Sequence, residues 1–313
     1  MTIRATPHPL LVQLAMVTTM VLWGVSFVAS KLVLTEITPL TYMGIRFLIA
    51  SILLAVVMLL RGRPRFDRRT HGLIALTALA EPVAYFLFES YAIRLIPATT
   101  ASLIIATIPL AVMVLAAIFL GEPIRRGGVI AVVVSIAGIV LLVTGDGTAV
   151  SGIATGRLPG ILLILGAVIS AAFYITLARN LTQRHDPVNL TVVQTWWGAG
   201  VFVLLWQMQS PPARSLGGLS PVGWGALAFL AVGATVTAFL LYNWALRYAE
   251  AGRASLYING IPLITALTGW ILLGERLTPL QLAGGALVLL SVRLIGSPRA
   301  APAVVAEVVP PEG

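Results

Sequence analysis

Two stretches of the chain repeat each other: SLIIATIPL at residues 102–110 and SLYINGIPL at residues 255–263. Each holds a proline within an apolar run, although a proline inside an α-helix costs about 3 kcal/mol. A shift of 153 residues superposes residues 86–122 on 239–275 without a gap. The coinciding residues include Phe86 and Phe239, Ala101-Ser102-Leu103 and Ala254-Ser255-Leu256, and Leu-Gly-Glu at 120–122 and 273–275. A match of this length predicts an internal duplication.

The composition indicates an integral membrane protein. Of the 313 residues 58% are hydrophobic and only 10% are charged, and the mean hydropathy is +0.99. Soluble domains carry about 25% charged residues. Ten apolar runs have the length of about 20 residues that crosses a bilayer. They centre near Met20, Ile52, Val83, Pro109, Val134, Val168, Phe202, Val236, Ile264 and Val288. The sequence therefore predicts an all-α protein with ten transmembrane helices.

The duplication and the ten spans together define the expected domains. We assign spans 1–5 to a first repeat at residues 1–150 and spans 6–10 to a second repeat at residues 151–298. An odd number of spans forces the second repeat to lie upside down in the membrane, an arrangement from which many secondary transporters are built. The Ala/Val/Pro-rich tail, residues 299–313, is expected to be disordered.

Arginine and lysine are unequally divided between the two sides of the predicted spans. One side holds 14 of them and the other holds 5, while Arg46 lies inside span 2. Because cytoplasmic loops carry the excess, both termini are expected in the cytoplasm of a multi-pass protein of the bacterial inner membrane. The net charge of +9 is spread along the chain, which argues against nucleic acid as a partner.

Several of these stretches resemble the EamA-type transporters of the drug/metabolite transporter (DMT) superfamily, and most closely the YddG-like amino-acid exporters. They include LWGVSFVASKLV (22–33), RFLIASILL (46–54) and YAIRLIPATTASLIIATIPLAVMVLAAIFLGE (91–122). The resemblance implies a basket in which spans 1, 3, 4, 6, 8 and 9 surround a central cavity. It also implies export of small metabolites, with amino acids as the best-represented cargo.

Three ionisable residues lie inside predicted spans, where such groups are costly and point to function. Glu81 and Glu89 are eight residues apart in span 3, about 80° around a helix, so both could face one cavity. Glu81 is the first candidate for a substrate-amine or proton site, and Arg46 is the third member of the group. The alternative is structural: a hydrogen bond, or a charge pair with Arg46.

Aromatic and amide side chains near the membrane centre form a second group of candidates. A pocket for an organic ligand combines an apolar wall with a few polar groups. The candidate substrate-binding residues are Trp23, Tyr85, Tyr174, Gln194, Trp197, Tyr242, Tyr257 and Asn259. Trp and Tyr also anchor helices at the membrane surface, which is the alternative explanation for such residues.

Three further features are structural, and two of them keep two interpretations. Pro109 and Pro262 are either packing kinks or hinges that leave a backbone carbonyl facing a cavity. Glu122 and Glu275 each precede a helix and are expected to cap it. The small residues of spans 5 and 10, such as Gly138 and Gly284, join the repeats or form a homodimer, so a monomer and a homodimer both remain possible.

The inventory of reactive residues argues against an enzyme. The chain has no cysteine, and its three histidines, His8, His71 and His185, fall in a terminus or in loops. No phosphate-binding GxxxxGK[ST] motif is present, so transport would depend on a gradient and not on ATP. We expect no metal, no cofactor and no catalytic residue. The expected partners are a small-molecule substrate and membrane lipid, and the alternative cargo is a cationic drug or another organic metabolite, exported in exchange for protons.

Overall fold

A computed structural model of the chain describes residues 8–62, 66–120, 124, 126–145, 157–246 and 259–294, and the regular secondary structure of these residues is helical. The predicted tail at 299–313 lies outside them. The helices are α1 (Pro9–Glu36), α2 (Pro39–Arg61), α3 (Arg68–Ala78), the π-helical segment η1 (Leu79–Ala84), α4 (Tyr85–Leu95), α5 (Ala98–Ile105), α6 (Ile108–Leu120), α7 (Arg126–Thr144), α8 (Arg157–Arg184), α9 (Pro187–Gln207), the short 3₁₀ turn η2 (Pro212–Arg214), α10 (Pro221–Phe229), the π-helical segment η3 (Leu230–Thr237), α11 (Ala238–Leu246), α13 (Ile261–Leu273) and α14 (Pro279–Leu294).

Several helices begin with the same local signal, a capping side chain followed by proline. The Thr38 hydroxyl accepts a hydrogen bond from the Thr41 N–H at the start of α2, and the Ser220 hydroxyl accepts one from the Gly223 N–H at the start of α10. A proline at the first helical position loses nothing, because its missing N–H would have no partner there. These sequences therefore fix where the spans begin.

Eight helical stretches of the described chain are long and apolar enough to cross a membrane, and α13 and α14 are shorter apolar helices. Together they account for the ten predicted spans and confirm the all-α membrane fold. Large apolar side chains such as Ile52, Leu59 and Val133 are exposed on outward faces of the bundle. A soluble protein rarely exposes so much apolar surface, whereas a lipid-facing surface requires it.

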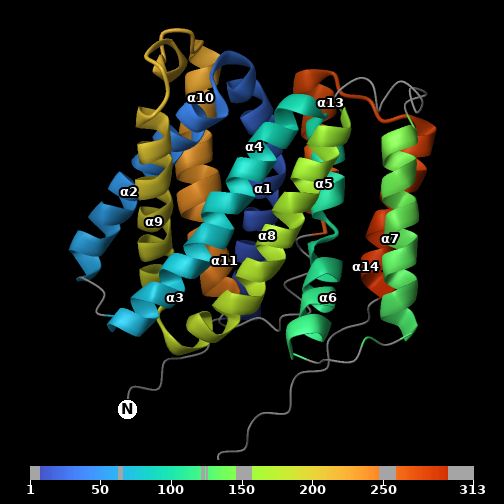
Figure 1. Cartoon of the computed structure of the whole chain (residues 1–313), viewed down its shortest axis with the longest axis horizontal. Helices are drawn as coiled ribbons and strands as arrows, with labels where there is room; N and C mark the ends of the chain where they lie inside the picture. The colour runs from blue at the N-terminus through green and yellow to red at the C-terminus, as the bar shows by residue number, and fades with distance from the viewer. Residues whose placement is uncertain are drawn as a thin grey trace, which may run out of the picture.

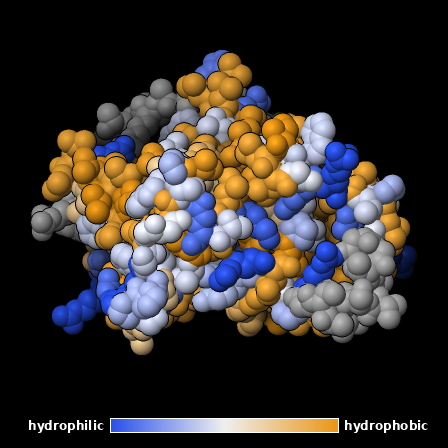
Figure 2. Space-filling view, turned by 90° about the horizontal axis from the view of Figure 1, so that it is seen from above, coloured by the Kyte–Doolittle hydropathy of each residue, from blue (hydrophilic) through white to orange (hydrophobic). Residues whose placement is uncertain are grey.

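The helices form a basket with a separate pair at one edge (Figure 1). There α7 packs along α14, while α2 packs along α9 and α4 along α8 in the main bundle. The end of the molecule that is uppermost in Figure 1 is seen from above in Figure 2, with hydrophilic residues across its middle and apolar residues along much of its margin. Apolar margins of this kind suit contact with lipid.

Close packing of α7 and α14 depends on two glycines. A Cβ atom built on Gly138 would lie 2.7 Å from the carbonyl oxygen of Gly284, and one built on Gly284 would lie 2.7 Å from the carbonyl oxygen of Gly138. Only glycine permits this approach of two backbones. These two residues therefore hold the edge pair together within one chain.

Three spans are interrupted near the middle of the bundle. The third and eighth spans pass through η1 and η3. The fourth span breaks at the turn Ala106–Thr107, and residues 259–260, where the described chain resumes, form a turn just before α13. A shift of 153 residues superposes these two turns. Pro109 and Pro262 stand at the second position of the helices that follow the turns, so neither proline lies in a helix interior.

Candidate functional site

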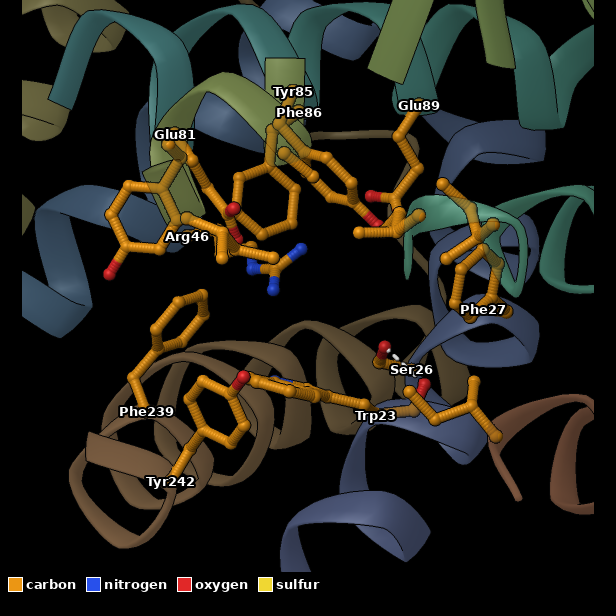
Figure 3. A pocket seen from close by; sticks show the side chains of 16 residues that line it. Trp23, Ser26, Phe27, Arg46, Glu81, Tyr85, Phe86, Glu89, Phe239 and Tyr242 are labelled. Atoms are coloured by element: carbon orange, nitrogen blue, oxygen red, sulfur yellow. Dashed lines mark hydrogen bonds between the residues drawn. The ribbon is translucent and has the colours of Figure 1, made fainter. Parts of the chain in front are cut away.

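A cavity of about 80 Å³ lies among the interrupted spans. Pockets that hold small organic ligands measure about 300–1,000 Å³, so the cavity has to widen to take such a ligand. The lining residues come from seven spans: Trp23, Ser26, Phe27, Arg46, Glu81, Tyr85, Phe86, Glu89, Ile105, Ile108, Ala171, Tyr174, Ile175, Phe239, Tyr242 and Ile261. In Figure 3, Glu81, Tyr85 and Glu89 lie on one side, Trp23, Phe239 and Tyr242 lie on the other, and the Arg46 side chain reaches between them.

Glu81 lines the cavity where the third span is interrupted. Its backbone is extended, with φ −145° and ψ 119°, because the ring of the following Pro82 disfavours the helical conformation at the preceding residue. Among the residues that the structure describes, the Glu81 carboxylate receives no hydrogen bond and forms no ion pair. It is therefore free to bind a group that enters the cavity.

Arg46, in contrast, is already engaged by the protein. Its side chain is 2% exposed, its Nε donates to the Thr235 hydroxyl at 2.8 Å, and its Nη1 donates to the Tyr42 hydroxyl at 2.5 Å. The guanidinium carbon lies 4.4 Å from the centre of the Phe86 ring, a cation–π geometry. Since Thr235 belongs to η3, Arg46 joins the second span to the interrupted eighth span.

Glu89 is also held by a neighbour. It is 4% exposed, and the Tyr85 hydroxyl, one helical turn away, donates to its Oε1 at 3.2 Å. Within the described structure Glu89 forms no ion pair with Arg46. Two carboxylates and one guanidinium thus line the cavity, so the fully ionised site carries one net negative charge.

Aromatic rings form the wall opposite Glu81. The Trp23 ring lies 5.3 Å from that of Phe239 and 4.9 Å from that of Tyr242, and its Nε1 donates to the Ala234 carbonyl at 3.2 Å. Tyr174 lines the cavity as well. The hydrogen bond and the ring contacts fix the Trp23 side chain, so this wall has a defined shape.

Comparison with known proteins identifies the family of this fold and cavity. The model of the EamA-like transporter family matches the chain twice, at residues 10–144 and 158–297. The chain belongs to the EamA-like transporter family. An uncharacterized transporter of Archaeoglobus fulgidus is 30% identical over 88% of this chain and 95% of its own length. The uncharacterized inner membrane transporter YedA of Escherichia coli K12 is 28% identical over 88% of this chain and 87% of its own length.

A solved crystal structure supports the fold of this EamA protein. It superposes with a TM-score of 0.64 at 19% sequence identity and covers 91% of this chain and 96% of its own. The relatives are named as transporters, so membrane transport is the activity of the family to which the chain belongs.

Three of the candidate substrate-binding residues that the structure describes do not line the cavity of this EamA protein. Gln194 is buried and its Nε2 donates to the Thr77 hydroxyl at 3.1 Å, which joins α9 to α3. Trp197 is 48% exposed on the outside of α9. Asn259 lies in the turn before α13, and its Oδ1 accepts no hydrogen bond from the described residues. Tyr257 lies outside the described residues.

Several lining residues were not among the candidates. Phe86 and Phe239 are one example. The sequence could have indicated them, because the 153-residue shift pairs these two phenylalanines. The same shift pairs Glu89 with Tyr242, so equivalent positions of the two EamA segments meet at one cavity. Ser26 and Phe27 were also missed, although they follow the candidate Trp23 by three and four residues and so share its face of α1.

The expected cap at Glu275 requires a correction. Glu275 does not cap the helix that follows it. Its carboxylate accepts hydrogen bonds from the Ala98 and Thr99 N–H groups at the start of α5. The start of α14 is capped by Thr278, whose hydroxyl accepts from the Gln281 N–H. The expected counterpart, Glu122, lies outside the described residues.

Titratable residues that could hold a metal do not cluster: within the described ranges no group of three His, Cys, Asp or Glu residues has the arrangement of a metal site. The residues that line the cavity supply charge, hydrogen-bonding groups and aromatic rings. This combination can select a small organic solute by its charged groups and its apolar body.

Proposed function

We propose that this chain is a secondary transporter that exports small metabolites, most readily amino acids, by alternating access between two inverted repeats. The observation that carries the proposal is the cavity at the interrupted spans, in which Glu81 is unoccupied and faces aromatic rings. Discontinuous spans around a site near the middle of the membrane are characteristic of secondary transporters.

The helix contacts support the two repeats at 1–150 and 151–298. α1 packs against α11 and α13, and its counterpart α8 packs against α4 and α6. The remaining counterparts pack against each other, α2 with α9 and α7 with α14. Such an exchange of partners is what two inverted copies of one five-span unit would produce.

The groups around the cavity suit an amino acid. Glu81 would bind the ammonium group, since a buried free carboxylate gains most from a cation. The half-helices α6 and α13 both begin at the cavity, at Ile108 and Ile261, and the positive end of a helix dipole attracts a carboxylate. The wall of Trp23, Phe239 and Tyr242 would contact the side chain of the cargo.

The proposal includes the inner membrane of a bacterial cell, with both termini in the cytoplasm. The arginine excess on one side of the spans supports this orientation. The name of the relative YedA places that protein in an inner membrane. Labelling of single cysteines in the loops on either side of intact cells would test it.

The function is tested by flux into proteoliposomes. The purified protein is reconstituted, and uptake of a panel of radiolabelled amino acids is compared with uptake by empty liposomes. Saturable uptake of a subset is the expected result. Absence of saturable uptake across the whole panel would overturn the amino-acid cargo.

The net negative charge of the cavity favours a second candidate, proton-coupled export of cationic drugs or of another organic cation. The aromatic rings opposite Glu81 suit an organic cation by cation–π attraction. Efflux of tetraphenylphosphonium driven by an imposed pH gradient, measured in the same proteoliposomes, separates the two. Cation efflux without amino-acid uptake would select this candidate.

A further inference from the structure

The cavity is closed toward the end of the molecule that is uppermost in Figure 1, because the lining side chains nearest that end, Arg46 and Glu89, are only 2% and 4% exposed. The lining residue Arg46 lies seven residues after the start of α2 at Pro39, and Glu89 lies six residues before the end of α4 at Leu95. At 1.5 Å per residue, about 10 Å of protein separates the cavity from this end. Any opening there has to divide this layer.

Within the layer, Glu275 joins two parts of the chain that are far apart in sequence. Its Oε1 accepts from the Ala98 N–H at 2.9 Å, and its Oε2 accepts from the Thr99 N–H at 3.0 Å and from the Thr99 hydroxyl at 2.8 Å. Ala98 and Thr99 form the first turn of α5, whose N–H groups have no partner inside the helix. A carboxylate at the positive end of a helix is favourable both as a charge and as an acceptor.

The local sequence around Glu275 is adapted to this contact. Gly274 ends α13 with φ +66°, a conformation that glycine adopts without strain, and the chain turns back so that the Glu275 N–H donates to the Gly269 carbonyl at 3.1 Å. A Cβ on Gly269 would lie 3.2 Å from Thr99 Cγ2 and 3.3 Å from Glu275 Oε2. The absence of a side chain at 269 therefore leaves room for the carboxylate and the threonine.

Lys31 binds the other half of the same turn. Its ammonium group donates to the carbonyls of Ile93 and Ile96, at the negative end of α4, and is attracted by the Glu275 carboxylate. The turn between α4 and α5 thus has a cation at the helix end before it and an anion at the helix start after it. Lys31 belongs to the same proposed repeat as this turn, whereas Glu275 belongs to the other, so the Glu275 hydrogen bonds join the two proposed repeats here.

We propose that Glu275 is the latch that holds the cavity closed at this end, and that its carboxylate releases the first turn of α5 each time the cavity opens there. The proposal rests on the proposed alternating-access function, because only a transporter has to break this contact. A permanent cap would instead stay in place throughout the cycle.

The absence of cysteine from the chain provides a direct test, since one introduced thiol is the only one present. Ser26→Cys places a reporter in the cavity wall, and Ser215→Cys, in the exposed loop between α9 and α10, marks the latch side of the membrane. A membrane-impermeant maleimide is applied to each side of oriented vesicles without cargo. Glu275→Gln is expected to raise the labelling rate of Ser26→Cys from the latch side about tenfold, because charge-assisted hydrogen bonds to α5 are lost.

The control is Glu36→Gln, which alters an exposed carboxylate at the same end of the molecule that binds Ser220 at the start of α10. Its labelling rate should stay within about twofold of that of the parent, since exposed contacts contribute little. Equal labelling in Glu275→Gln and the parent would overturn the latch. Thr99→Val, which removes one of the three hydrogen bonds, repeats the test if Glu275→Gln is poorly folded.

A disulfide between α5 and α13 tests whether this contact has to open during transport, with flux as the measurement. Thr99 Cγ2 lies 3.2 Å from a Cβ built on Gly269, so a pair of cysteines at 99 and 269 suits a disulfide. Oxidation should stop flux, and reduction should restore it. Undiminished flux in the oxidised protein would overturn the latch and leave the transport function standing. If the parent protein carries no cargo, the proposed transport function is overturned. The labelling rates would still show whether Glu275 keeps the cavity closed at this end.

Discussion

The charged side chains of the cavity differ in whether they have hydrogen-bond partners within the protein. Arg46 donates to Tyr42 and Thr235, and Glu89 accepts from Tyr85, whereas Glu81 has no partner among the described residues. Glu81 is half-buried at the cavity wall, so its carboxylate is available to a group that enters the cavity. This difference singles out Glu81 as the residue for cargo or for a proton.

Glu81→Gln tests that assignment. The amide keeps the size of the side chain but neither ionises nor carries a negative charge, so the pH dependence of flux across about pH 5.5 to 8 should flatten. Flux is measured in proteoliposomes at fixed cargo concentration. The other titratable groups that line the cavity, namely Arg46, Glu89, Tyr85, Tyr174 and Tyr242, are left unchanged. The same pH profile in variant and parent would exclude Glu81 as the proton carrier.

Arg46→Gln should lower the free energy of unfolding. The substitution removes the charge-assisted bonds that tie α2 to η3, and leaves the buried Tyr42 and Thr235 hydroxyls with poorer partners. We expect a loss of about 2 kcal/mol in the free energy of unfolding. Thermal unfolding in detergent measures the loss, with Glu81→Gln as the control that should unfold near the parental temperature. An unchanged unfolding temperature in Arg46→Gln would contradict a structural role.

At the scale of elements, the starts of α6 and α13 explain why two prolines can stand in apolar runs. Pro109 and Pro262 occupy the second position of α6 and α13, where a helix lacks N–H partners in any case. The turns at Ala106–Thr107 and at residues 259–260 border the cavity through Ile105, Ile108 and Ile261. The breaks are therefore placed where half-helix ends can meet a ligand.

Pro262→Ala separates turnover from folding. Alanine supplies an N–H that could join the half-helix to the preceding segment, and a stiffer span would slow the exchange between open states. The expected result is a severalfold lower flux with unchanged thermal stability. Pro279→Ala, at the first position of α14 and away from the cavity lining, is the matched control and should leave flux unchanged. Parental flux in Pro262→Ala and Pro109→Ala would leave the prolines a packing role only.

At the scale of the whole molecule, the edge pair of α7 and α14 connects the two proposed repeats away from the cavity. Gly138→Ala should push these helices apart, since its Cβ would lie 2.7 Å from the Gly284 carbonyl oxygen. We expect a loss of about 2 kcal/mol, as for other overpacked contacts. Gly200→Ala, on an exposed face of α9 with no atom within 4 Å of its added Cβ, is the control. Equal thermal unfolding of both variants would contradict the close α7–α14 contact.

The sequence by itself was sufficient to predict the membrane fold, the positions of ten spans and the duplication that pairs them. These features depend on apolar length and on repeated local patterns, which can be read along the chain without knowing which helices meet. The spacing of Glu81 and Glu89 suggested a shared cavity, and both residues line it. That spacing argument assumed a continuous helix, whereas the structure interrupts the span at Glu81.

Only the tertiary structure decided which side chains meet. Gln194 and Trp197 are amide and aromatic residues of a predicted span, and Tyr174 is an aromatic residue of another. Yet Gln194 binds Thr77 and Trp197 faces outward. Glu275 was expected to cap the next helix and instead caps α5, 176 residues from Thr99 along the chain. The reason is physical: helix length and helix starts follow from neighbouring residues, but the rotation of each helix about its axis and the choice of its partners are set by packing of the whole bundle.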